Sequence, residues 1–203
     1  MQTLKVLLFV SILLFPFNGE RLDGLGVGDK AADFNLKNVD GRIVSLETNE
    51  AAKGYILVFT CNTCPYANMY EDRIIELHNK YADQGFPVLA IQPNDTNKSP
   101  GDSYENMQAR AKEKSYAFPY VIDETQETTK TYGATNTPHV YVLNKVSKNN
   151  FRIEYIGAID NNSRNADAAS KHYVEEAVEN LISGADIPTK STKAIGCQIK
   201  WGD

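Results

Sequence analysis

Apolar residues in the first half of the chain fall into two short continuous runs with a helical pattern between them. Residues 55–60 read Tyr-Ile-Leu-Val-Phe-Thr, and residues 86–91 read Phe-Pro-Val-Leu-Ala-Ile. Short runs rich in β-branched residues are typical of strands that are buried on both faces of a sheet. The apolar side chains between the runs recur three or four positions apart, at Ala67, Tyr70, Ile74, Leu77 and Tyr81. This spacing predicts an amphipathic helix that ends at Gln84-Gly85 and joins two parallel strands.

Shorter patterns add elements on both sides of this unit. An Asp-Gly turn at residues 40–41 predicts an N-terminal hairpin, and Ser103 is a suitable helix cap. The remaining predicted strands are residues 33–37, 42–46, 120–122, 138–143 and 152–156, with a polar loop at 144–150, and the remaining helices are residues 103–115, 124–132 and 166–183. This order predicts an α/β domain over residues 24–184, with a central mixed sheet, flanking helices and an antiparallel closing pair of strands. We expect residues 185–203 to form a tail that packs on this domain.

The first residues have the pattern of an export signal. Lys5 precedes an apolar stretch from Val6 to Phe17 that is interrupted only by Ser11. Such a stretch is shorter than the roughly 20 residues that cross a bilayer, and it matches the apolar region of a secretory signal. We therefore expect residues 1–19 to be a signal peptide, the protein to be periplasmic or extracellular, and the mature chain to have no membrane span. An uncleaved N-terminal anchor is the alternative.

Charge and cysteine content narrow the classes of function. Lys and Arg total 21 against 26 Asp and Glu, so the formal net charge is −5. An acidic chain without a basic cluster argues against nucleic acid as a partner. Three cysteines are too few for a disulfide-stapled miniprotein, but thiols in an oxidising compartment pair or cycle. The positions of the cysteines therefore matter more than their number. No pattern in the sequence specifies an oligomeric state.

Two of the cysteines stand at the predicted start of the first helix, in Cys61-Asn62-Thr63-Cys64-Pro65. Proline suits the first helical position, so Cys64 is the expected N-cap residue, with Cys61 just outside the helix. The free N–H groups and the positive end of the helix dipole stabilise a thiolate there. Two intervening residues allow a tight turn that brings both sulfur atoms within bonding distance. The motif predicts a dithiol that opens a substrate disulfide and then closes on itself.

Three other interpretations of the pair stay open. A structural disulfide is one, although such bonds usually close longer loops. Half of a zinc site is another, although no second Cys-x-x-Cys or His-x-x-x-His occurs in the chain. The third is a pair of inert buried thiols.

The chain resembles the thioredoxin fold in its strand 55–60, in its Cys-Asn-Thr-Cys-Pro motif and in Thr137-Pro138 at the head of a strand. The segment Val27–Phe34 is similar to the redoxin branch, also called the alkyl hydroperoxide reductase/thiol-specific antioxidant superfamily. Within it, exported proteins with Phe-Thr-Cys-Asn-x-Cys-Pro-Tyr and a Gly-Cys-x-Ile-Lys-Trp tail are the most similar. The resemblance covers residues 26–201. It implies a thioredoxin-like fold and a thiol–disulfide oxidoreductase, with a possible antioxidant role, that acts on protein thiols through Cys61 and Cys64 without a cofactor.

The resemblance also implies that the Thr137-Pro138 peptide bond is cis and lies against the active-site sulfur atoms. Cis peptide bonds are essentially confined to proline, and a proline that opens a strand leaves the backbone of Thr137 free to pair with an extended substrate. An ordinary trans proline is the alternative.

Two family features are missing. Tyr55 and Val58 stand where thioredoxins carry a buried aspartate before the nucleophile. The proline and threonine of the peroxiredoxin signature are also absent in both registers, since Leu57 and Cys61, or Gly54 and Val58, occupy those positions. The Thr-Cys-Pro sequence at residues 63–65 still resembles that of peroxiredoxins, which leaves a weak thiol peroxidase as one alternative.

The third cysteine and one histidine have open roles. We expect Cys64, at the helix start, to be the nucleophile and Cys61 to resolve, although greater exposure of Cys61 would reverse the order. Cys197 is a candidate second resolving cysteine, or a silent buried thiol in a tail held by Ile199 and Trp201.

His139 follows Pro138 and is either a neighbour of the dithiol or a structural residue. A copper-binding delivery protein of the same fold, with Cys61, Cys64 and His139 as ligands, is the alternative from a different class of function.

Overall fold

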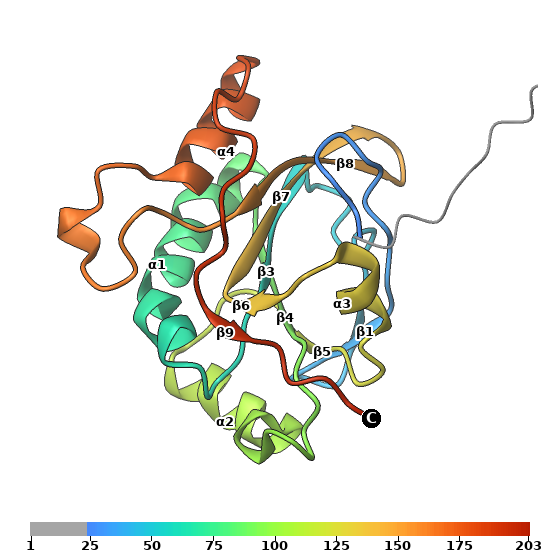
Figure 1. Ribbon diagram of the computed structural model, residues 1–203. Coiled ribbons are helices and arrows are strands. Elements are labelled where there is room, and N and C mark those ends of the chain that lie inside the picture. Colours follow the sequence, from blue (N-terminus) through green and yellow to red (C-terminus); the bar gives the residue numbers. More distant parts are fainter. Residues whose placement is uncertain (1–23) are drawn as a thin grey trace, which may run out of the picture.

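The protein, seen in a computed structural model that describes residues 24–203, is built around one seven-stranded mixed sheet (Figure 1). The strand order is β2-β1-β5-β4-β3-β7-β8. The strands are β1 (Leu36–Asn38), β2 (Ile43–Val44), β3 (Gly54–Phe59), β4 (Val88–Gln92), β5 (Tyr120–Ile122), β7 (His139–Ser147) and β8 (Asn150–Gly157). The predicted signal peptide, residues 1–19, lies outside the described residues.

Pairing in the sheet follows the predicted scheme. Strands β3, β4 and β5 are parallel, whereas β3 with β7 and β7 with β8 are antiparallel. The β1–β2 hairpin joins the far edge through an antiparallel pairing of β1 with β5. Every residue of β3 is buried, as its uninterrupted apolar run predicts. The expected thioredoxin-like α/β fold with a central mixed sheet is confirmed.

Helices cover both faces of the sheet. They are α1 (Pro65–Tyr81), α2 (Tyr104–Glu113), α3 (Glu127–Tyr132) and α4 (Tyr173–Ser183), together with short 3-10 turns at Ala82–Gln84, Pro100–Asp102 and Ala166–Ala168. Ile56 and Val58 of β3 pack in one apolar cluster with α1, α2 and α4. Leu57 and Phe59 point to the other face, where they pack with α3 and the segment before β3. Successive side chains of a strand point to opposite faces of the sheet, so the core forms two layers, one on each side of the sheet.

Two boundaries differ from the prediction. Residues 144–150, expected to be a loop, are mostly strand, because β7 and β8 extend beyond the core as a polar hairpin whose turn has Asn149 at a φ of 57°. The last helix begins at Tyr173 rather than at residue 166. The Asn161 carboxamide oxygen accepts the backbone N–H groups of Ser170 and Lys171, at 3.0 and 3.1 Å. These bonds to a side chain replace bonds within a helix, so Ser170 and Lys171 stay outside the helix that begins at Tyr173.

The chain after α4 crosses the end of the sheet as an extended tail. Its strand β9 (Cys197–Gln198) pairs with β6 (Asn136–Thr137), and the tail continues past α3 to the C-terminus (Figure 1). Neither strand of this second sheet belonged to the predicted elements. Within residues 24–203, no helix combines the length and apolar character needed to cross a membrane.

Candidate active site

The dithiol motif lies between the end of β3 and the start of α1. Cys64 is the N-cap residue of α1, with extended backbone angles (φ −77°, ψ 122°), and Pro65 occupies the first helical position. This is the arrangement that the sequence predicts. Cys64 thus stands at the N-terminus of α1, the positive end of the helix dipole, although its side chain makes no capping hydrogen bond.

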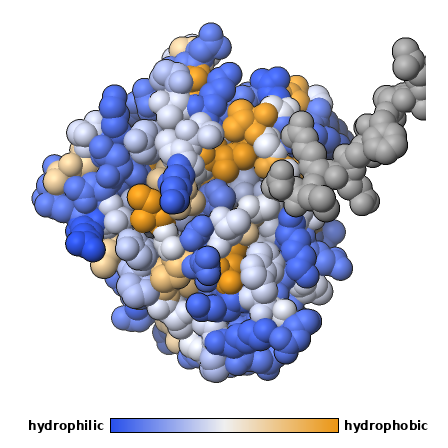
Figure 2. Space-filling model, in the orientation of Figure 1, coloured by the Kyte–Doolittle hydropathy of each residue, from blue (hydrophilic) through white to orange (hydrophobic). Residues whose placement is uncertain are grey.

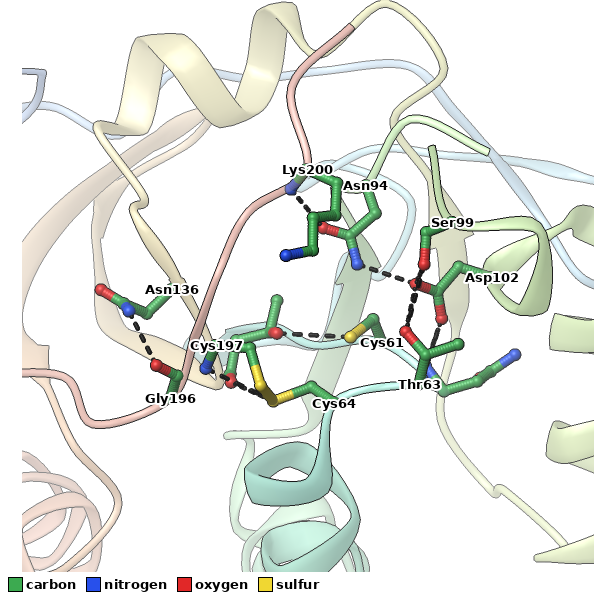
Figure 3. Close-up of a disulfide and its surroundings, with 12 residues drawn as sticks. Cys61, Thr63, Cys64, Asn94, Ser99, Asp102, Asn136, Gly196, Cys197 and Lys200 are labelled. Carbon is green, nitrogen blue, oxygen red and sulfur yellow. Dashed lines mark hydrogen bonds between the residues drawn. A yellow bond between two sulfur atoms is a disulfide. The ribbon is translucent and has the colours of Figure 1, made fainter. Parts of the chain in front are cut away.

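A buried carboxylate holds the turn between the two cysteines. Asp102 is fully buried, and its Oδ1 accepts the backbone N–H groups of Asn62 and Thr63, at 2.8 and 3.0 Å. Its Oδ2 accepts from the Thr63 hydroxyl at 2.8 Å, from the Ser99 hydroxyl at 2.7 Å and from Asn94 Nδ2 at 2.8 Å (Figure 3). Five donors on one carboxylate fix the loop backbone. Sequence analysis missed this residue.

Thr137 lies against both sulfur atoms of the motif. Cys61 Sγ is 3.3 Å from Thr137 Oγ1, and Cys64 Sγ is 3.1 Å from the Thr137 carbonyl oxygen. The Thr137–Pro138 peptide bond is cis, as the resemblance implies. Strand β7, which begins directly after Pro138, pairs with β3 and so brings this peptide bond to the N-terminus of α1.

The sulfur of Cys64 is bonded to Cys197 rather than to Cys61 (Figure 3). The bond joins positions 133 residues apart in the sequence. The interpretation of Cys197 as a silent thiol is therefore wrong. Ile199 is buried, as expected for a packed tail, whereas Trp201 is exposed. Packing holds only part of the tail, and a covalent bond secures it beside Thr137.

Cys61 is the free thiol of the site and is itself buried. Burial raises its pKa above the ordinary cysteine value, and the negative charge of Asp102 raises it further. Hydrogen bonding to Thr137 acts in the opposite direction, with a smaller effect. The net effect is a raised pKa, which favours the thiol form of Cys61 over the thiolate.

His139, the first residue of β7, is buried in this arrangement. Its ring is buried against Tyr141, with ring centroids 5.0 Å apart, and its Nδ1 lies 3.4 Å from the backbone N–H of Thr135. Burial lowers its pKa to about 4. Among residues 24–203, no three His, Cys, Asp or Glu side chains form a group that could hold a metal ion. The described residues therefore do not provide the copper site postulated at Cys61, Cys64 and His139.

Comparison with known proteins identifies the family of this fold and motif. The AhpC/TSA family matches residues 27–154, which include β1 to β7, the dithiol motif and the cis-proline bond. The chain belongs to the AhpC/TSA family.

Relatives and solved structures similar to this AhpC/TSA protein are matched over most of their length. The thiol-disulfide oxidoreductase ResA of Bacillus cereus is 25% identical over 139 residues, covering 68% of this chain and 76% of that protein. A solved structure of an uncharacterised conserved protein from Geobacillus kaustophilus is 35% identical, with a TM-score of 0.80, and covers 87% of this chain and 93% of that one. A hypothetical protein from Sinorhizobium meliloti is 29% identical, also with a TM-score of 0.80, over 88% of this chain and 96% of that one.

Proposed function

We propose that this AhpC/TSA protein is an exported thiol–disulfide oxidoreductase that exchanges disulfides with protein thiols through Cys61 and Cys64. The observation that carries the proposal is the position of the Cys64 sulfur. It stands at the start of α1, contacts the carbonyl of Thr137, and is bonded to a sulfur from a distant segment while Cys61 remains a free thiol on the same turn. One sulfur with two prospective partners is what disulfide exchange requires.

Reduction of a substrate would proceed in two steps. The Cys64 thiolate attacks one sulfur of the substrate disulfide, forms a mixed disulfide, and releases the other substrate sulfur as a thiolate that takes up a proton. Cys61 then loses its proton and attacks Cys64 Sγ, so that a Cys61–Cys64 disulfide forms and the second substrate sulfur leaves. Two electrons pass from the dithiol to the substrate, and no bound cofactor takes part. An external dithiol returns the pair to its reduced form, and oxidation of a substrate dithiol is the reverse sequence.

Thr137 and Pro138 would position the reacting groups. The carbonyl of Thr137 faces Cys64 Sγ, and its hydroxyl faces Cys61 Sγ, so this one residue orients both sulfur atoms. Pro138 lies between β6 and β7 and has no N–H to donate to a neighbouring strand. Cys197 would act as a second resolving cysteine, because attack of its thiolate on Cys64 Sγ in the mixed disulfide releases the substrate sulfur and forms the Cys64–Cys197 bond. Attack of Cys61 on that bond would then give the Cys61–Cys64 disulfide and a free tail thiol.

The name of the ResA relative supports this activity, and the apolar stretch at the N-terminus supports export to a periplasmic or extracellular location. An oxidising compartment is also where a dithiol of this kind meets disulfide-bonded proteins. The partners would be protein thiols and disulfides, and an antioxidant role would follow from removing unwanted protein disulfides.

Insulin reduction tests the activity. With dithiothreitol as the reductant, the protein should accelerate insulin precipitation. Cys64→Ser and the double variant Cys61→Ser/Cys197→Ser should each lower the catalysed rate by about tenfold or more, because the first removes the attacking sulfur and the second removes both sulfurs that can resolve the mixed disulfide. Met69→Ser, at an exposed residue of α1, is the matched control and should keep the rate. An unchanged rate in Cys64→Ser would refute the proposal.

A further inference from the structure

The C-terminal segment 196–202 lies in the candidate site as an extended strand. Strand β9 pairs antiparallel with β6, so that Cys197 stands opposite Thr137 and Gln198 opposite Asn136. The backbone N–H of Ile199 donates to the carbonyl of Thr135 at 3.1 Å, and Asn136 Nδ2 donates to the carbonyl of Gly196 at 2.9 Å. The segment is thus held through main-chain atoms, in a register that delivers one cysteine to Cys64.

The residue before that cysteine has no room for a side chain. A Cβ atom on Gly196 would lie 2.1 Å from the carbonyl oxygen of Thr137 and 2.5 Å from its carbonyl carbon. These are backbone atoms of a buried residue, and the same carbonyl oxygen is 3.1 Å from Cys64 Sγ. The Thr137 carbonyl cannot move away from an added Cβ atom without losing its contact with the Cys64 sulfur. Glycine is therefore required at this position of any strand bound in this register.

After Cys197, the site forms hydrogen bonds with backbone atoms of the tail and buries one of its side chains. Lys200 donates its N–H to Asn94 Oδ1 at 2.9 Å, and its carbonyl accepts from the N–H of Asp95 at 2.8 Å and from Gln126 Nε2 at 2.9 Å. The side chain of Ile199 is buried, whereas those of Gln198, Lys200 and Trp201 are exposed.

The surroundings of the segment agree with recognition through the backbone. The face of the molecule that the tail crosses is mainly polar, with small separate apolar patches (Figure 2). Asn94 also connects the segment to the dithiol loop, since its Nδ2 donates to the same Asp102 carboxylate that holds Asn62 and Thr63 (Figure 3). The docked strand and the turn that carries the two cysteines thus share one hydrogen-bond network.

We propose that the surface beneath residues 196–202 is the substrate-binding site for an extended polypeptide with the pattern Gly-Cys-x-apolar, and that the chain's own tail occupies it as an internal ligand. The inference rests on the proposed function.

Attack of the Cys61 thiolate on Cys64 Sγ forms the Cys61–Cys64 disulfide and releases Cys197 as a thiolate, which takes up a proton. External dithiol then reduces the new disulfide. The tail afterwards remains held only by non-covalent contacts and competes with an incoming strand of the same pattern.

A pair of synthetic peptides tests the selectivity. The first matches residues 194–203 and carries thionitrobenzoate on its cysteine, and the second is identical except for alanine in place of the glycine. Both are mixed with full-length Cys61→Ser/Cys197→Ser protein, in which Cys64 is the one cysteine left, and the release of thionitrobenzoate is followed. The glycine peptide should react about tenfold faster than the alanine peptide, because the added methyl group meets backbone atoms.

A further substitution tests occupancy by the tail. Adding Gly196→Ala to the same protein should weaken docking of the tail and raise the rate with the glycine peptide several-fold, whereas Ile195→Ala, at an exposed neighbour, should leave that rate unchanged. Equal rates for the two peptides, with normal reaction of Cys64 toward dithiobis-nitrobenzoate, would overturn the selectivity and leave the oxidoreductase proposal standing. Absence of any reaction of Cys64 with dithiobis-nitrobenzoate would overturn both.

Discussion

Cys61 and Cys64 stand on one turn, but their sulfur atoms have different surroundings. Cys64 lies at the positive end of a helix of 17 residues, where a thiolate is favoured. Cys61 is buried near the carboxylate of Asp102, and both its burial and that charge favour its thiol form. This asymmetry is the basis on which we propose Cys64 for the first attack and Cys61 for the resolving step.

Alkylation of Cys61 should show this environment directly. In a Cys64→Ser/Cys197→Ser protein, the rate of reaction with iodoacetamide should rise with pH and reach half its maximum above the ordinary cysteine pKa, since the thiolate is the reacting form. Asp102→Asn removes a negative charge and should move the midpoint to lower pH. Glu105→Gln removes an equal charge at an exposed position of α2 and serves as the control. A midpoint below the ordinary pKa in the parent protein would contradict the assignment.

His139 should make the stability of the protein depend on pH. Burial lowers its pKa to about 4 in the folded state, against an ordinary value of 6.5. Between these values the unfolded chain binds a proton that the folded chain does not, so the free energy of unfolding falls by about 3 kcal/mol as the pH drops from 6.5 to 4.

Urea unfolding at several pH values measures this effect. His139→Gln should remove the contribution of His139 and make the fall in the free energy of unfolding with pH shallower. His172→Gln, at a half-exposed side chain, should leave that fall unchanged. Parallel curves for the parent and His139→Gln would show that the imidazole is not buried in its neutral form.

At the scale of elements, a buried carboxylate on α1 joins this helix to α2 and the segment that follows. Glu71 accepts from Arg110 Nε and Nη2, at 2.7 and 2.8 Å, and from the Tyr116 hydroxyl at 2.6 Å. Lys114 Nζ lies 3.0 Å from its Oε2. The contact ties α2 to the helix that presents Cys64, and sequence analysis offered no sign of it.

Replacing Glu71 should therefore destabilise the protein measurably. Glu71→Ala leaves Arg110 and Tyr116 without their acceptor in a largely buried position, and we expect it to lower the free energy of unfolding by about 2 kcal/mol. Glu113→Ala removes the exposed partner of the same arginine and should cost about 0.5 kcal/mol or less. Both losses of unfolding free energy are measured by chemical denaturation. Equal losses would mean that the buried contact of Glu71 stabilises the protein no more than the exposed contact of Glu113.

Elements with a strong local pattern were predictable from the sequence, and the others were not. The apolar run of β3, the proline at the start of α1 and the Ser103 cap, which accepts the N–H of Asn106 at 3.3 Å, are encoded within a few residues. The two-residue strands β6 and β9 are too short to have a periodicity of their own. They exist because the tail meets the Thr137 backbone, which is a tertiary contact.

At the scale of the whole molecule, the site is assembled from segments that are distant in the sequence. The motif at Cys61 and Cys64 meets Thr137 of β6. It also meets Asp102 from the loop after β4 and Cys197 from the tail (Figure 3). The motif could be predicted because its sequence signal is local, whereas the cis bond was implied by the resemblance to the thioredoxin fold. The role of Asp102 could not be predicted, because an aspartate in a polar loop gains its meaning only from the path of the chain. For Cys197 the sequence offered two alternatives, a second resolving cysteine and a silent thiol, and only the path of the tail distinguishes them.

Disulfide mapping across a redox titration tests the shared role of Cys64 most directly. The protein is equilibrated in glutathione buffers of increasing oxidation, its free thiols are alkylated, and its disulfide-linked peptides are identified by mass spectrometry. The account predicts that Cys64 is found bonded both to Cys61 and to Cys197, and that isolated protein with the Cys64–Cys197 bond forms the Cys61–Cys64 bond without added thiol. Finding Cys64 joined to Cys197 alone at every potential, with Cys61 always a free thiol, would contradict it.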